Sequence, residues 1–306
     1  MPDAIIIGSG SAAKHHSKAL QQLGFKIYFV TSRKLDNELT FKVLAKAIES
    51  VEPFLVVIAS ETYKHLDSIN ELSKIGYSGY VVCEKPLFLL GKKLDISNFK
   101  KFRVGYNLRY DAGLIKLKHI LTSQSKEIYL VLSYYGRNLE TWRPNRNHRK
   151  SYSSYSEKGG GVLWDLSHDL DFAFWLFGDL DLINTYGGRV SKVTVDSSDF
   201  WDIRYSVRNQ KTIGQLTLNY LDRNPERTIK IITKKETFTL DMIKNEIYAD
   251  SIKIWEGKPE NSTFYDMHFD ILKNEKDSAC DLAEAIKLEN FINLAIEINS
   301  RVNDRQ

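Results

Sequence analysis

The stretch Ala4-Ile5-Ile6-Ile7-Gly8-Ser9-Gly10-Ser11-Ala12-Ala13 decides the fold of the first third of this chain. Its apolar half is typical of a buried parallel strand. Its second half fits G-x-G-x-x-A and leads into a helix expected from about Ala12 to Leu23, with Gly24 at the C′ position. Because a helix N-terminus presents N–H groups to a pyrophosphate, this order predicts a phosphate-binding loop. The alternative is a glycine-rich turn that binds nothing.

Strands and helices alternate after this loop. Apolar runs predict strands at Lys26–Thr31, Phe54–Ala59 and Tyr80–Cys83, and helical patterns lie between them at 40–49 and Tyr63–Ile75. Such alternation predicts a parallel sheet with right-handed crossovers. We therefore expect residues 1–108 to form a doubly wound Rossmann domain that binds a dinucleotide.

The pattern changes after about residue 108. Strand-like segments follow one another without intervening helices, which favours an antiparallel meander. One strong helix is expected at about 162–177, and a last helix, roughly 278–299, closes the chain and can pack back on the first domain. Residues 109–306 are thus predicted to form a substrate-binding α/β domain with an open, mainly antiparallel sheet, so that the fold class is α/β plus α+β. The expected strands are 128–135, 201–207, 212–220, 228–233, 236–241 and 246–255.

Composition excludes several classes of protein. The net charge of +4 equals that of segment 137–158 alone, which has six Lys or Arg and two Glu, so a general nucleic-acid-binding surface is not expected. No run of about 18 apolar residues and no signal peptide occur, which predicts a cytoplasmic protein without a membrane span. Cys83 and Cys280 are expected as free thiols, and the absence of CxxC or HxxxH spacing argues against a metal site.

Lys85 is the strongest candidate for a catalytic residue. It stands at the carboxyl end of a predicted parallel strand, where open α/β sheets bind cofactors. A lysine there can donate or accept a proton, Glu84 can hold it in place, and Pro86 restricts its backbone. The alternative is a solvated lysine at a strand end.

Three further segments carry a family resemblance. They are Cys83-Glu84-Lys85-Pro86, Gly105-Tyr106-Asn107-Leu108-Arg109-Tyr110, and the glycine-rich segment Gly159–Asp171 that ends in Asp165-Leu166-Ser167-His168-Asp169-Leu170-Asp171. In this order after the phosphate loop, they resemble the glucose–fructose oxidoreductase / inositol dehydrogenase (Gfo/Idh/MocA) family, from residue 4 to about 178. The resemblance implies an open sheet that forms a homodimer or homotetramer, a lysine near nicotinamide and substrate, and a sugar or sugar nucleotide as substrate.

The cofactor choice is expected at the end of the second strand. Thr31-Ser32-Arg33-Lys34 has no acidic residue to bond the ribose of NAD, so NADP is slightly favoured over NAD. The alternative is that Arg33 and Lys34 are solvated loop charges. His65 resembles a family position near the cofactor. The residues expected at the cofactor are Gly8, Ser9, Gly10, Ser11, Ala12, Ser32, Arg33, Ser60, Glu61, His65, Glu84 and Lys85.

His168 is the expected acid–base partner of Lys85. On one helix, Asp165, His168 and Asp169 would share a face, which places Asp165 as a third catalytic candidate. Many family members have the aspartate four residues before the histidine, whereas Asp165 is three before it. The alternative is a histidine that only caps the helix or bonds within the domain, and Asp171 is expected to support the fold.

The basic segment 137–158 suggests an anionic substrate. Arginine forks suit phosphate or carboxylate, and aromatic rings suit sugar faces. The alternative is a solvated basic loop or a subunit interface. The expected substrate residues are Asn107, Arg109, Trp142, Arg143, Arg149 and Tyr152, with Asn219 and Tyr220 as weaker cleft candidates.

The predicted function is that of an NAD(P)-dependent oxidoreductase that transfers a hydride between nicotinamide and a sugar-like CH–OH group or ketone. Two alternatives stay open: a redox-neutral epimerase or lyase that retains its cofactor, and a non-catalytic NAD(P)-binding regulatory protein.

Overall fold

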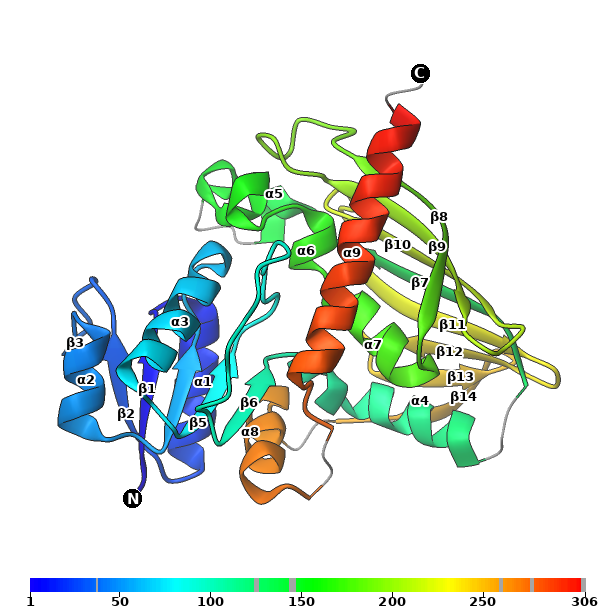
Figure 1. Ribbon diagram of the computed structural model, residues 1–306. Helices are drawn as coiled ribbons and strands as arrows, with labels where there is room; N and C mark the ends of the chain where they lie inside the picture. The colour runs from blue at the N-terminus through cyan, green and yellow to red at the C-terminus, as the bar shows by residue number, and fades with distance from the viewer. Residues whose placement is uncertain (37, 124–126, 143–146, 259–260, 276–277, 304–306) are drawn as a thin grey trace. The chain divides into compact units, whose positions relative to one another are not determined.

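The computed structural model describes residues 1–36, 38–123, 127–142, 147–258, 261–275 and 278–303. The chain forms two compact units (Figure 1). The first comprises Met1–Tyr110 and Asn261–Glu289, and the second comprises Asp111–Glu260 and Asn290–Gln306.

The first unit is built on a parallel sheet with the strand order β3-β2-β1-β4-β5-β6. This is the order of a Rossmann fold, and it reverses between β1 and β4. The predicted doubly wound sheet is thus confirmed. The strands are β1 (Asp3–Ile7), β2 (Lys26–Val30), β3 (Leu39–Phe41), β4 (Leu55–Ile58), β5 (Tyr80–Cys83) and β6 (Lys101–Val104).

Helices cover both faces of this sheet because its strands are apolar on both sides. Ala4 and Ile6 of β1 face α1 (Ser11–Gln22) and α8 (Thr263–Lys273), which join one buried core. On the opposite face lie α2 (Leu44–Val51) and α3 (His65–Ile75), preceded by the short helix η1 (Thr62–Lys64) (Figure 1). The helix predicted at 40–49 is therefore displaced, since residues 39–41 pair with β2 as β3.

The second unit is built on a mixed sheet with the order β14-β13-β12-β11-β7-β10-β9-β8. Among the described strands of this second sheet, only β7 and β10 pair in parallel, so the expectation of a mainly antiparallel sheet is confirmed. The strands are β7 (Ile128–Gly136), β8 (Leu180–Gly188), β9 (Phe200–Val207), β10 (Ile213–Asn219), β11 (Glu226–Thr233), β12 (Thr237–Asp241), β13 (Glu246–Ala249) and β14 (Ile252–Glu256). The single strand predicted at 246–255 is a hairpin, because Asp250 and Ser251 both adopt positive φ and turn the chain.

Helices lie along one face of the second sheet in Figure 1. They are α4 (Ala112–Ser123), α5 (Leu139–Trp142), α6 (Val162–Asp165), α7 (His168–Phe177) and the C-terminal part of α9 (Leu282–Asn303). The single helix predicted at 162–177 is wrong, because the chain breaks at Leu166 and Ser167. There the bonds run from the N–H of Ser167 to Trp164 and from the N–H of Asp169 to Leu166, a tighter i→i−3 turn.

Two further sequence expectations concern cysteine and membrane spans. Cys83 and Cys280 are both buried thiols that are not joined in a disulfide, as predicted. Within the described residues, no helix is both long and apolar enough to span a membrane.

Candidate functional site

Two glycines of the β1–α1 turn have different physical roles. Gly8 has φ +108, and a Cβ there would lie 2.4 Å from the carbonyl oxygen of Ala59. Gly10 has φ −77, and a Cβ there would meet no described atom within 4 Å. The fold thus requires glycine at position 8, where the ends of β1 and β4 touch, but leaves open space beside Gly10.

The N-terminus of α1 points its backbone donors into this turn. Among the described residues no side chain caps the helix at Gly10, and its first turn contains no acidic residue. Ser11 is exposed and Ala12 half-buried. Ser9 Oγ lies 3.1 Å from Thr31 Oγ1, which ties the turn to the end of β2. An uncapped helix N-terminus beside a glycine is the arrangement that binds phosphate.

The residues after β2 are open to solvent. Ser32 and Arg33 are both exposed, and the backbone N–H of Arg33 donates to Thr31 Oγ1 at 3.2 Å. The guanidinium of Arg33 carries the charge expected to face a 2′-phosphate, and it also acts on the Glu61 carboxylate. Arg33 and Lys34 therefore supply positive charge at this edge of the sheet.

The turn after β4 joins the same edge. Ser60 is half-buried, and Glu61 is exposed and paired with Lys64 at 3.0 Å. His65 is buried, with Nδ1 2.8 Å from the carbonyl oxygen of Pro86 and Nε2 3.2 Å from that of Ser60. Burial lowers the pKa of His65. His65 thus braces the turn after β4 against the turn after β5.

Glu84 and Lys85 follow directly on β5. Lys85 is half-buried, and its peptide bond to Pro86 is cis. Glu84 is buried, with Oε1 accepting from His16 Nε2 at 2.8 Å and Oε2 accepting from the N–H of Lys85 at 3.3 Å. Burial alone would raise the pKa of Glu84, but the hydrogen bond and charge of His16, with the charges of Lys85 and His65, hold it below its ordinary value. Glu84 is thus a fixed carboxylate beside Lys85.

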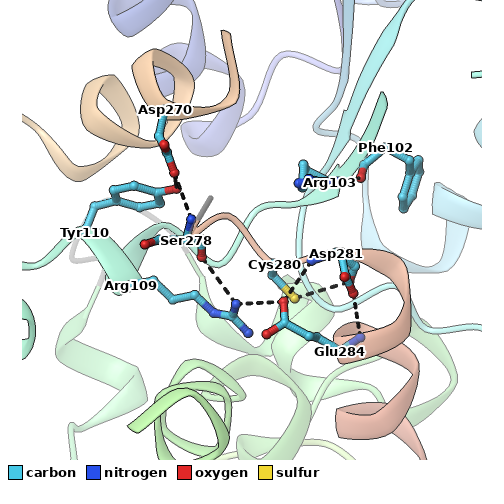
Figure 2. Close-up of polar contacts among 9 residues, drawn as sticks. All are labelled: Phe102, Arg103, Arg109, Tyr110, Asp270, Ser278, Cys280, Asp281 and Glu284. Carbon is cyan, nitrogen blue, oxygen red and sulfur yellow. Dashed lines mark hydrogen bonds and ion pairs between the residues drawn. The ribbon is translucent and has the colours of Figure 1, made fainter. Parts of the chain in front are cut away.

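Arg109 lies in a buried structural ion pair rather than at an open site. It belongs to the short helix η2 (Asn107–Tyr110), is 2% exposed, and donates through Nη1 to Glu284 at 2.9 Å and to the Ser278 carbonyl at 3.3 Å (Figure 2). In the same helix, Asn107 donates to Thr263 Oγ1. These contacts of Arg109 hold the start of α9, and its expected role in substrate binding stays a prediction.

In the second unit, Asp165 is the centre of a buried hydroxyl cluster. Its carboxylate accepts from Tyr152 at 2.7 Å, from Ser153 at 2.8 Å and from Tyr220 at 2.8 Å. Burial and the charge of Asp165 raise the pKa of Tyr220 well above its ordinary value. Because its carboxylate accepts three hydroxyl donors, Asp165 suits the positioning of Tyr152, which is itself half-buried.

Asp169 faces a different partner from Asp165. It makes a two-pronged ion pair with Arg227, at 3.0 Å to Nε and 2.6 Å to Nη2. The Arg227 guanidinium also lies 4.4 Å from the centre of the Tyr135 ring. The break between α6 and α7 thus sends Asp165 and Asp169 to separate clusters, and the expectation that they share one helix face with His168 is wrong.

The remaining predicted residues of this unit fall in three places. His168 is half-buried at the first position of α7. Trp142 joins the hydroxyl cluster through Tyr220, with ring centres 6.3 Å apart, whereas Arg149 is exposed and donates to the Lys192 carbonyl. Arg143 lies outside the described residues. The structure therefore brings Trp142, Tyr152 and Asp165 together, whereas the side-chain hydrogen bond of Arg149 goes to the Lys192 backbone.

Other residues named from the sequence have structural roles. Asp171 is buried, as expected of a residue that supports the fold. Asn219 accepts from the N–H groups of Leu221 and Asp222 and caps a turn. Sequence reasoning missed Ser153 and Arg227, and it left His16 without a role.

Solved structures of several enzymes align with nearly the whole chain. An oxidoreductase from Thermotoga maritima is 19% identical, with a TM-score of 0.79 over 97% of this chain and 96% of its own. The WlbA dehydrogenase from Bordetella pertussis, in complex with NADH and UDP-GlcNAcA, is 18% identical, with a TM-score of 0.78 over 98% and 96%. Levoglucosan dehydrogenase, in complex with NADH, is 16% identical, with a TM-score of 0.80 over 98% and 97%.

Protein-family models give no match to this chain, and neither do curated proteins. At the identities of the structural neighbours, the likeness establishes the fold. The chain therefore has the two-domain fold of the glucose–fructose oxidoreductase / inositol dehydrogenase family, as its sequence motifs predicted.

Proposed function

We propose that the protein is a nicotinamide-dependent oxidoreductase that acts on a CH–OH group or ketone of a sugar or sugar nucleotide. The observation that carries the proposal is the strand order of the first sheet. It places the glycine turn after β1 and Lys85 after β5 at the same edge, where open α/β sheets bind dinucleotides. The structural neighbours crystallised with NADH and sugars support the substrate class.

The turn after β1 fits a dinucleotide. The open space beside Gly10 and the uncapped donors of α1 suit a pyrophosphate, which Gly8, Ser9, Ser11 and Ala12 would surround. Ser60, Glu61, His65 and Glu84 stand at the neighbouring strand ends and complete the proposed cofactor set. The dinucleotide would supply hydride transfer, and the protein supplies binding, orientation and proton transfer.

The choice between NAD and NADP is a separate proposal. Exposed Arg33 and Lys34 with Ser32 favour the extra phosphate of NADP, while the neighbours WlbA and levoglucosan dehydrogenase were both crystallised with NADH. Titration of both cofactors against wild type and Arg33→Ala decides it. We expect Arg33→Ala to weaken NADP and leave NAD unchanged, and a clear NAD preference of the wild type would overturn the NADP assignment.

Lys85 and His168 are the proposed groups of proton transfer. The backbone N–H of Lys85 donates to Glu84, and the charge of Lys85 lowers the pKa of that carboxylate, so Lys85 has a fixed anionic neighbour. His168 begins α7 and is half-buried, and an imidazole exchanges a proton near neutral pH. In the same unit Asp165 orients the Tyr152 hydroxyl. Trp142, Arg149, Tyr152 and Asn107 remain proposed substrate contacts, with Arg143 from the sequence alone.

A turnover panel tests this function. The purified protein is incubated with NAD or NADP and with neutral sugars, acidic sugars and nucleotide sugars, and reduced nicotinamide is followed by absorbance. We expect turnover that favours the anionic substrates. Equal turnover of neutral sugars would overturn the anionic preference, and binding of cofactor without turnover of any substrate would overturn the enzyme proposal.

We also propose a homodimer or homotetramer. Figure 1 shows helices against one face of the second sheet, and Ile213 on β10 and Ile183 on β8 are 42% and 54% exposed. Apolar side chains at the surface of a sheet are typical of subunit interfaces. Sedimentation of the purified protein as a monomer would overturn this proposal.

A further inference from the structure

Three buried titratable side chains form a continuous hydrogen-bonded chain inside the first unit. His16 Nε2 lies 2.8 Å from Glu84 Oε1, and His16 Nδ1 lies 2.7 Å from His268 Nε2. The three come from α1, the turn after β5 and α8. Both histidines are 0% exposed, and Glu84 is 8% exposed. Three polar groups taken out of water at such distances constrain one another strongly, because an unsatisfied buried group is costly.

At the Glu84 end of this hydrogen-bonded network, the direction of the hydrogen bond is fixed. An ionised carboxylate only accepts hydrogen bonds, so His16 Nε2 carries a proton and donates it to Glu84. Burial and the charge of His16 lower the pKa of His268 well below its ordinary value, so His268 is neutral. His268 Nδ1 is buried and has no partner among the described residues. Within the described residues, His268 thus contacts this hydrogen-bonded network through Nε2, which lies against His16 Nδ1.

The other end of the chain reaches Lys85. Glu84 Oε2 accepts from the N–H of Lys85, and a Cβ at Gly105 would lie 2.9 Å from Glu84 Oε1. The Glu84 carboxylate is therefore held by hydrogen bonds to His16 and to the Lys85 backbone, and it packs against the backbone of Gly105. The charge of Lys85 acts on Glu84, so the position of this carboxylate sets the field at the lysine.

We propose that His16 and His268 are positioning residues for Lys85: through Glu84 they hold an anion at a fixed point beside the lysine. This inference rests on the proposed function for its catalytic meaning. It assigns a role to two histidines that lie 252 residues apart and that packing alone does not require to be polar.

The alternative is that the chain only fastens α1 and α8 to each other. The two helices are also joined by apolar packing, with His16 edge-on to Phe264 at 4.9 Å between ring centres. A purely structural role predicts loss of stability in every variant but no specific change at Lys85. The experiment therefore reads out Lys85 itself.

The variants are chosen by the atoms that they keep. His16→Gln retains a donor near the position of Nε2, His16→Leu removes it, and His268→Leu removes the outer member of the chain. His15→Leu is the matched control, because His15 is exposed on the same helix and stacks on the same Phe264 ring at 5.2 Å. Circular dichroism and thermal unfolding first establish that each variant folds, and if His16→Leu does not fold, His268→Leu takes its place.

The first readout is the rate at which Lys85 reacts with acetic anhydride, measured by mass spectrometry at a fixed pH. Without the His16 donor, burial raises the pKa of Glu84, and the anion that lies beside Lys85 weakens, so the reactivity of the Lys85 amine should rise. We expect labelling in His16→Leu to be faster by up to about tenfold, with His16→Gln closer to wild type and His15→Leu unchanged. Equal labelling in all folded variants overturns the inference, whether or not a substrate is known.

The second readout compares the effect of each variant on kcat with its effect on KM and on the cofactor Kd. We expect His16→Leu to lower kcat by about 10- to 100-fold, as loss of a supporting hydrogen bond does elsewhere, with KM and the cofactor Kd unchanged. An unchanged kcat in a folded His16→Leu protein overturns the positioning role. A wild type without turnover overturns the proposed function instead and leaves the labelling experiment to decide the inference.

Discussion

Replacement of Gly10 by alanine separates cofactor binding from folding. At φ −77 and ψ −168 the backbone of Gly10 is in the extended region that alanine adopts freely, and the added Cβ meets no described atom within 4 Å. The free energy of unfolding is expected to stay the same or to rise by about 0.4–1 kcal/mol, because alanine restricts the unfolded chain.

The cost appears when the dinucleotide binds. The methyl group occupies the space into which a phosphate would approach the uncapped N–H groups of α1. Loss of one hydrogen bond to a charged group costs about 1.5–3 kcal/mol, which is about a 10- to 150-fold increase in Kd. Isothermal titration with NAD and NADP measures the affinity, and urea denaturation measures stability.

Gly8→Ala is the contrasting variant. Its Cβ would lie 2.4 Å from the Ala59 carbonyl oxygen at φ +108, so we expect it to destabilise the unit before binding is tested. If Gly10→Ala bound both dinucleotides as tightly as wild type, the turn after β1 would not be the phosphate site. If it unfolded, the open space beside Gly10 would not be real.

Three further predictions concern buried polar groups. Burial and the charge of His16 lower the pKa of His268 from 6.5, so the unfolded chain binds more protons and stability falls as the pH drops below about 6.5, by about 1.4 kcal/mol per pH unit. Urea denaturation at two pH values checks this, and an equal slope in His268→Gln would contradict it. Arg227→Met leaves buried Asp169 without its cation and should cost about 3–5 kcal/mol of unfolding free energy, and a loss below about 1 kcal/mol would refute the buried pair. Asp165→Asn turns an acceptor of three hydroxyls into a partial donor and should cost about 1–3 kcal/mol in the same assay, whereas an unchanged midpoint would show that the cluster contributes nothing.

Apolar runs and glycines made the first sheet predictable. Short continuous apolar runs such as Leu55–Ile58 favour buried strands, and Gly24 and Gly76 mark helix ends with positive φ, as expected of residues that end a helix. Strand β6 was missed, because Lys101-Phe102-Arg103-Val104 is short and alternates like an exposed edge. The sequence pattern also does not show that α8 returns to the first unit, since nothing local marks that contact.

The break between α6 and α7 could not be predicted from local signals. The segment 162–177 contains neither proline nor an internal glycine, and its apolar content favours one continuous helix. Tertiary contacts decide the outcome: Asp165 binds the hydroxyl cluster and Asp169 binds Arg227, which one helix face would not allow. The partners Ser153 and Arg227 were invisible because they are brought there by other elements.

The candidate site was only partly predictable for the same reason. Local sequence motifs identify Lys85 and the glycine turn, and because each follows a parallel strand, the strand order gives their positions in the fold. Arg109 looked like a cation for substrate, yet its partner Glu284 lies 175 residues away. The hydrogen bond between His16 and His268 is likewise a long-range contact that no spacing in the sequence predicts.

The turnover of Lys85→Ala with the best substrate of the panel tests the central claim most directly. If Lys85 transfers the proton in a nicotinamide-dependent reaction, kcat should fall by about 100- to 10,000-fold while the cofactor Kd is unchanged. Turnover retained at the wild-type rate in Lys85→Ala would contradict the account.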